Sequence, residues 1–209
     1  MNQRFLSLCG IIAPVLFVFM TILGAALRPG YSHISDTVSE LFSPGSPNKP
    51  LLDTLHTTFA LLLTLFGIGV LQFVRRSGQS TLTGIIGASL YLTAGVLSIA
   101  TATIFPQDPS SSPPTFTGQM HINLTGMVGL LSMLSILLLG LWFSRTKLFP
   151  WFGIYSFITV GLVILSAVFF MAMMGTPIMG LTERITVLVG FTWTFILARW
   201  MFTRQEKTG

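Results

Sequence analysis

Six long apolar runs constrain the fold of this chain more than any other feature of its sequence. Each run is long enough to cross a hydrocarbon core of about 30 Å as an α-helix that rises about 1.5 Å per residue. A transmembrane barrel would instead show short segments of alternating polarity. The runs therefore predict an all-α polytopic membrane protein, a bundle of six transmembrane helices in a single membrane domain, residues 1–209. The predicted spans are Leu6–Leu27, Leu55–Val74, Leu82–Phe105, Ile122–Phe143, Trp151–Met174 and Leu181–Phe202.

The low content of charged residues supports the same fold class. Only 8% of the 209 residues are charged, whereas a soluble domain carries about 25%. The net charge of +5 comes from basic residues scattered between apolar runs, so nucleic acid is not an expected partner. Gly24–Ala26 resembles a signal-peptide cleavage site, but the apolar run around it is longer than a signal core. We therefore interpret this run as an uncleaved span.

The distribution of basic residues predicts the orientation of the bundle. The positive-inside rule places the side richer in Lys and Arg in the cytoplasm. That side holds both termini, the tail 203–209 and most of the 11 basic residues, namely Arg4, Arg75, Arg76, Arg145, Lys147, Arg199, Arg204 and Lys207. The other side holds Arg28, Lys49 and Arg184, all three histidines and every acidic residue except Glu206. We expect a multi-pass protein of the inner or plasma membrane. Its histidines and nearly all of its acidic residues should lie on the external side.

The first external loop, residues 28–54, is predicted to contain a short amphipathic helix within Ser32–Phe42. Apolar residues recur at helical spacing and share one face, which we expect to lie on the membrane: Ile34, Val38, Leu41 and Phe42. The opposite face carries His33, Asp36, Ser39 and Glu40. Thr37 and Glu40 also fit a capping box, which would start the helix later.

Asp36 and Glu40 are like charges four residues apart, a spacing that destabilises a helix unless other groups offset it. Arg28, Lys49, Arg184 or a bound cation could do so. The alternative is a polar face that is simply solvated.

Polar residues also open the helices that follow. Asp53 and His56 share a face at the start of the second span, which fits either a site or an ordinary helix start. His121 and Asn123 open the fourth span, and their spacing points them in nearly opposite directions, so only one can face the interior. Small residues predict close packing on the third span (Gly84, Gly87, Ala88, Ala94, Ser98, Ala102) and on the fourth (Gly126, Gly129).

Two further external features carry charge. Pro106 and Pro109 flank Asp108 and are expected to fix where it points, ahead of a linker or lid at Ser110–Thr117. Glu183 and Arg184 are adjacent at the edge of the last span, where an acid and a base are costly unless partners from other helices bind them. We interpret this pair as a structural clamp.

Five short motifs follow one another along the chain: Pro29–Ser32, Ser39–Leu41, Phe105–Asp108, Gly118–His121 and Gly180–Arg184. In these motifs, their order and their placement at one membrane face, the chain resembles the prokaryotic six-helix membrane family catalogued as domain-of-unknown-function family 998. The resemblance covers essentially the whole chain. It implies a fold and a membrane location, and it implies no activity.

Two classes of function remain open from these residues. The first is a non-enzymatic protein that binds a lipid headgroup or a small amphiphile at the external face, with membrane lipids as partners. Its predicted ligand-binding residues are Arg28, Ser39, Glu40, His56, Asp108, His121 and Arg184. The second is an intramembrane lipid hydrolase or transferase, for which His121, Asp108 and Glu40 are the catalytic candidates.

A metal could assist that second function, with His33, His56 and His121 as weak candidate ligands. The chain lacks the His-x-x-x-His pattern of the alkaline-ceramidase and adiponectin-receptor hydrolases, which also have seven helices. A bis-histidine haem between His56 and His121 ranks lower, because an electron carrier usually needs a second haem or a partner on the cytoplasmic side and no histidine remains there. A transporter also ranks lower, because no clear inverted repeat and no mid-membrane charge is present. We predict no cofactor.

Overall fold

The computed structural model describes residues 2–109, 112–146 and 148–206. Its elements are α1 (Gln3–Ala26), η1 (Val38–Phe42), α2 (Lys49–Arg76), α3 (Leu82–Thr103), α4 (Phe116–Thr146), α5 (Pro150–Ala172) and α6 (Met179–Glu206). All six α-helices are long and apolar enough to cross a membrane, and the described residues contain no strand. The predicted all-α fold with six spans is confirmed. Lys147, Lys207, Ser110 and part of the tail 203–209 lie outside the described residues.

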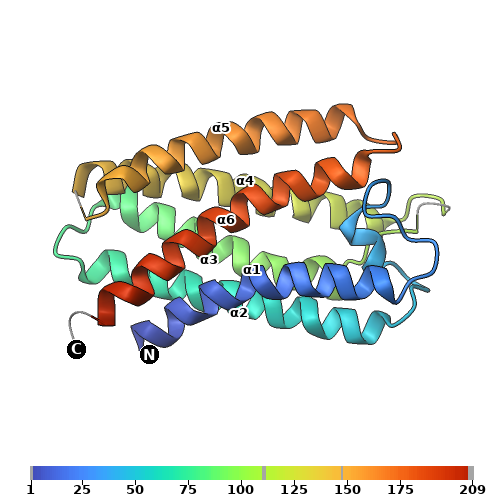
Figure 1. Ribbon diagram of the computed structural model, residues 1–209, viewed down its shortest axis with the longest axis horizontal. Coiled ribbons are helices and arrows are strands. Elements are labelled where there is room, and N and C mark those ends of the chain that lie inside the picture. The colour runs from blue at the N-terminus through green and yellow to red at the C-terminus, as the bar shows by residue number, and fades with distance from the viewer. Residues whose placement is uncertain (1, 110–111, 147, 207–209) are drawn as a thin grey trace.

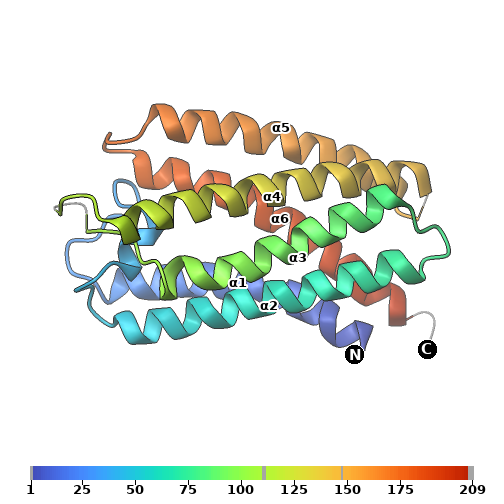
Figure 2. The same cartoon turned by 180° about the vertical axis from the view of Figure 1, so that it is seen from behind.

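The helices form a closed ring in sequence order. Each α-helix packs on its neighbours in the chain, and α6 returns to pack on α1. Figure 1 shows both termini at one end of the bundle. We call this the proximal end and the opposite one the distal end. Figure 2 shows α2, α3 and α4 side by side on the far side of the ring.

Several helices extend beyond the predicted spans at the distal end. α2 begins at Lys49, α4 at Phe116 and α6 at Met179. With 31 residues, α4 is about 47 Å long at about 1.5 Å per residue, well over the thickness of a hydrocarbon core. The first turns of these helices lie beside the distal loops (Figure 1).

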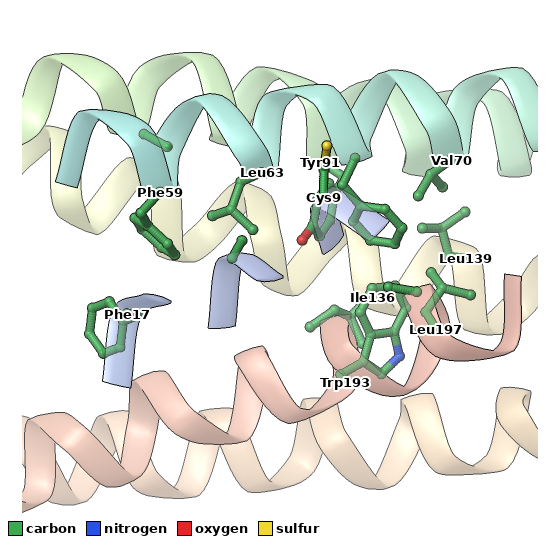
Figure 3. Packing of buried hydrophobic residues seen from close by; sticks show 14 of the residues in the cluster. Cys9, Phe17, Phe59, Leu63, Val70, Tyr91, Ile136, Leu139, Trp193 and Leu197 are labelled. Atoms are coloured by element: carbon green, nitrogen blue, oxygen red, sulfur yellow. The ribbon is translucent and has the colours of Figure 1, made fainter. Parts of the chain in front are cut away.

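Aromatic and aliphatic side chains from all parts of the ring fill its interior (Figure 3). Many polar atoms within this interior are paired, because hydrocarbon offers them no water, although His56 Nδ1 and Gln72 Oε1 have no partner. The Trp193 indole donates to Ser156 Oγ at 2.8 Å, and the Tyr91 and Thr194 hydroxyls lie 2.9 Å apart. These bonds tie α6 to α5 and to α3, so they fix the tilt of α6 across the bundle.

Small residues permit the closest helix contacts, as predicted for α3. Gly84 lies against Trp142 and Gly87 against Leu139. The prediction for Gly126 and Gly129 is wrong within a single chain, because a Cβ on either would meet no atom within 4 Å. Both glycines are exposed.

The loop helix differs from the prediction in type, length and face. It is a 3₁₀ helix limited to Val38–Phe42, with Thr37 at its start. The side chain of Thr37 makes no cap hydrogen bond there. Val38, Leu41 and Phe42, expected against the membrane, are buried within the protein, and so is Glu40, which was expected on the polar face and is 8% exposed. A continuous α-helix is prevented because the Asp36 carboxylate accepts the Ser32 amide at 2.9 Å and closes a separate turn.

Gly67 on α2 tests the packing between α2 and α3. A Cβ there would lie 2.8 Å from Leu92 Cα on α3, which is backbone and cannot move aside. We expect Gly67→Ala to lower the melting temperature in detergent micelles, since overpacking costs about 1–3 kcal/mol. Gly129→Ala is the matched control and should leave the melting temperature unchanged. Equal melting of the two variants would contradict this packing.

Candidate functional site

The segment between α1 and α2 lies across the distal end of the bundle. Its 3₁₀ helix, η1, contacts α1, α2 and α6, and the segment is seen beside the end of α6 in Figure 1. Side chains from α6 and α4 hold it from two directions. Most of the ionisable residues singled out in the sequence lie in or around this segment.

The side chain of Glu183 binds the backbone of this segment. The Val38 amide donates to Glu183 Oε2 at 2.6 Å, and the Leu181 amide donates to the Ile34 carbonyl at 2.9 Å. Val38 is the first residue of η1, where a 3₁₀ helix leaves its amides without internal partners. The carboxylate on α6 therefore provides the acceptor that the local backbone lacks.

Arg184 binds the same segment through carbonyl oxygens. Its Nη1 donates to three backbone carbonyls at 2.8–2.9 Å, those of His33, Asp36 and Gly180, and its Nη2 donates to the Tyr31 hydroxyl. A Cβ at Gly180 would collide with the Asp36 carbonyl, so glycine permits this close approach. Glu183 and Arg184 thus bind the loop rather than each other, an arrangement suited to the predicted clamp.

Tyr31 completes this contact as a neutral phenol. Its hydroxyl donates to the Thr37 carbonyl at 2.8 Å while it accepts from Arg184. Burial raises the pKa of the Tyr31 phenol to about 12, although the neighbouring Arg184 guanidinium opposes the shift. The phenol therefore keeps its proton at any physiological pH and remains able to donate.

Arg28 and Glu40 are brought together, but not as an ion pair. Arg28 Nη1 donates to the backbone carbonyl of Glu40 and, at 3.3 Å, to Ser46 Oγ. Ser43 and Ser46 hydroxyls donate to the same carbonyl at 2.8 and 2.9 Å. Burial, and then the negative Asp36, raises the pKa of the Glu40 carboxyl, while Arg28 opposes the shift. Glu40 thus takes up a proton more readily than an exposed glutamate.

His121 meets Ser39 in the interior of the distal end. Its Nδ1 lies 2.6 Å from the Thr101 carbonyl and 2.8 Å from the Phe105 carbonyl, both at the end of α3. Its Nε2 lies 3.1 Å from Ser39 Oγ. His121 is 5% exposed and Asn123 is exposed, as their opposite directions predicted. Both ring nitrogens of His121 are engaged, so a haem ligand role would require breaking one of these contacts.

His56 is buried separately on α2. Its ring is 5.2 Å from that of Phe42 and 5.7 Å from that of Phe59, and its Nδ1 has no hydrogen-bond partner. His33 lies elsewhere and is exposed, with its ring 5.7 Å from that of Tyr31. Among the described residues, no three His, Cys, Asp or Glu side chains lie together in a way that could hold a metal ion.

Asp108 and Asp53 are not part of this cluster. The Asp108 carboxylate accepts the Thr115 amide and hydroxyl, both at 2.7 Å, and Thr115 in turn caps the start of α4 by accepting the Gly118 amide. The hydrogen bonds from Thr115 lower the pKa of Asp108. Asp53 pairs with Lys49 at 2.7 Å on the surface of α2. Local backbone and side-chain partners account for both acids.

A groove between α1 and α6 was not anticipated. It consists of two adjoining hollows of about 430 and 260 Å³ that share Val18 and Leu188. We call it the α1–α6 groove. The larger hollow is lined by Pro14, Val15, Val18, Phe19, Leu188, Phe191, Thr192 and Phe195. The smaller is lined by Phe17, Val18, Thr21, Ile22, His33, Arg184 and Leu188. Of the predicted ligand-binding residues, Arg184 lines this groove and the others do not.

The sequence carries little signal for the groove, because its walls are ordinary apolar residues on the first and last helices. Its two ionisable residues, His33 and Arg184, were identified by type but lie far apart in the chain. A hydropathy pattern does not reveal that α6 returns to α1.

Six apolar helices closed into a ring, with most acidic residues at one end, define a multi-pass membrane protein. The model of the family described as "Protein of unknown function (DUF998)" matches residues 11–200, and the chain belongs to this family. The resemblance seen in the short motifs is thereby confirmed. No curated protein and no solved structure matches the chain.

The contact between Glu183 and Val38 can be tested by hydrogen exchange. Glu183→Ala leaves the Val38 amide without its acceptor, and a hydrogen bond to a charged group is worth about 1.5–3 kcal/mol. We expect amides in residues 31–42 to exchange about 10- to 100-fold faster in this variant, measured by mass spectrometry in micelles. Asp53→Ala, which removes an acid paired only with Lys49, should leave exchange in this segment unchanged. Unaltered exchange in Glu183→Ala would show that the clamp does not hold the loop.

Proposed function

We propose that this protein binds an anionic lipid, with an acyl chain in the α1–α6 groove and the headgroup at its distal end. The observation that carries the proposal is an apolar groove that ends at a cation. Most of its lining is aliphatic or aromatic, whereas His33 and Arg184 lie in the hollow that is nearer the distal loops. Small-molecule sites commonly combine apolar walls with a few polar groups that fix the ligand's orientation.

The charge of Arg184 favours an anionic headgroup. Its Nη1 and Nη2 are bound by carbonyls and a phenol, which carry no net charge, and its buried Nε has no hydrogen-bond partner. In the described part of the chain no carboxylate forms an ion pair with it, since Glu183 turns to the Val38 amide. A guanidinium left without a counter-ion attracts phosphate, with which arginine forms charge-assisted hydrogen bonds.

His33 adds pH sensitivity to the headgroup end. Burial, and then the Arg184 charge, lowers the pKa of its imidazole. A bound phosphate would favour the charged imidazole. The distribution of Lys and Arg supports an extracytoplasmic position for the distal end, and hence a lipid of the outer leaflet.

The proposal is tested by lipid retention in native mass spectrometry of the full chain. Purified protein is mixed with equal amounts of phosphatidylglycerol and phosphatidylcholine in micelles. We expect wild-type protein to retain phosphatidylglycerol preferentially. Leu188→Trp fills the point where the two hollows join and should reduce retention at least about tenfold, equivalent to about 1.4 kcal/mol. Ile158→Trp is the matched control, because Ile158 is an exposed apolar residue on α5 outside the groove.

Two arginine variants separate charge from loop anchoring. Arg184→Gln should abolish the preference for phosphatidylglycerol, whereas Arg184→Lys keeps the charge, loses the multiple carbonyl contacts and should retain the preference. Equal retention of both lipids by wild-type protein, or equal loss in Leu188→Trp and Ile158→Trp, would overturn the proposal.

A further inference from the structure

The contact between Ser39 and His121 has a defined direction. Carbonyl oxygens only accept hydrogen bonds, so a neutral His121 imidazole, with Nδ1 facing the Thr101 and Phe105 carbonyls, carries its proton on Nδ1. Its Nε2 then presents a lone pair, and the Ser39 hydroxyl at 3.1 Å is the donor. A hydroxyl whose hydrogen points at an imidazole lone pair is the arrangement that activates a serine nucleophile.

The end of α3 provides the orienting group for the imidazole. The Phe105 amide donates to the Ala100 carbonyl instead of to the Thr101 carbonyl, which would be its acceptor in a regular α-helix. The Thr101 carbonyl is therefore free for His121. The last carbonyls of a helix also carry a partial negative charge, which favours an imidazolium beside them. These carbonyls therefore hold the ring and stabilise the charge it acquires, as a carboxylate does in a catalytic triad.

Ser39 is placed where an ester could reach it. It belongs to the first turn of η1 and is half-buried, whereas the His121 behind it is almost fully buried. This part of the bundle lies at the distal ends of the helices, beyond the apolar middle of the spans. In a bilayer the ester carbonyls of lipids lie between the hydrocarbon and the headgroups, so a site at the ends of membrane-spanning helices is one that they can approach.

We propose that Ser39 and His121 form a nucleophile and general base that transfer an acyl group from an ester-linked lipid. Ser39 Oγ attacks the ester carbonyl and its proton passes to His121 Nε2. The C–O bond to the alcohol breaks, and that alkoxide takes the proton from Nε2, which leaves an acyl ester on Ser39. Water then attacks this ester, gives its proton to His121, and Ser39 recovers it, so the products are a carboxylic acid and an alcohol. The step requires no ligand in the α1–α6 groove and is independent of the proposed lipid retention there.

The first test uses a fluorophosphonate carrying a fluorescent reporter, applied to the full chain in native membranes. We expect phosphonylation of wild-type protein at Ser39, identified by mass spectrometry, and none at Ser39 in Ser39→Ala. His121→Asn keeps a donor toward the α3 carbonyls but has no base at the Nε2 position. We expect it to react at least about 100-fold more slowly, the lower range for general-base assistance. Ser35→Ala, a half-buried serine of the same loop, is the matched control and should label normally.

A second test separates base catalysis from a purely structural bond. The chain has a single cysteine, Cys9, which is 2% exposed, so a cysteine introduced at position 39 can be followed almost without background. His121 should draw the proton from this thiol, and we expect Ser39→Cys to react with iodoacetamide at pH 7 at least about tenfold faster than Ser35→Cys. The added change His121→Asn should remove the difference.

Either of two results would overturn the assignment. One is wild-type labelling that equals that of Ser39→Ala, or that falls on another serine. The other is an alkylation rate at position 39 no greater than at position 35. A structural hydrogen bond between Ser39 and His121 would produce one or both of these results.

Discussion

Backbone polar groups that the helices leave unpaired determine how the distal end is built. Bonds along each helix satisfy the interior of a span, but the ends of helices and the loop between α1 and α2 require other partners. Several ionisable side chains there are bound to backbone groups instead of to another ionisable side chain: Arg28 on the Glu40 carbonyl, Arg184 on three carbonyls, Glu183 on the Val38 amide, and His121 on carbonyls at the end of α3. Lys49 and Asp53 are an exception, because they bind each other. The backbone requirement therefore accounts for part of the concentration of ionisable residues at this end.

The features that depend on hydrophobicity and residue size could be predicted from the sequence. The features that depend on hydrogen bonds between distant segments could not. Six spans follow directly from the length of the apolar runs, and the close packing of Gly84 and Gly87 follows from residue size. The faces of the first external loop could not be predicted, because helical periodicity assumes a continuous α-helix. Bonds from α6 and the turn at Asp36 override that assumption, and Glu40 is buried together with the apolar residues of η1.

For the candidate sites, the sequence indicated which residues were candidates but not which of them contact one another. Ser39, His121 and Arg184 were singled out as polar residues near one membrane face, yet the sequence does not indicate that Ser39 meets His121 or that Arg184 lines a groove. Asp108 shows the same limit, since its position between two prolines suggested a site, whereas its bonds from Thr115 just before α4 had no sequence signal. The two proposals therefore rest on contacts between elements distant in the chain.

The closure of the ring by α1 and α6 also sets an order for assembly. α1 is synthesised before α6, so the flank of α1 that lines the groove faces the bilayer until α6 arrives. The walls of the α1–α6 groove meet only at that step. The groove stays open on its outer side, where Val15, Phe19 and Leu188 are exposed, so a molecule held there would remain able to exchange with the surrounding lipid.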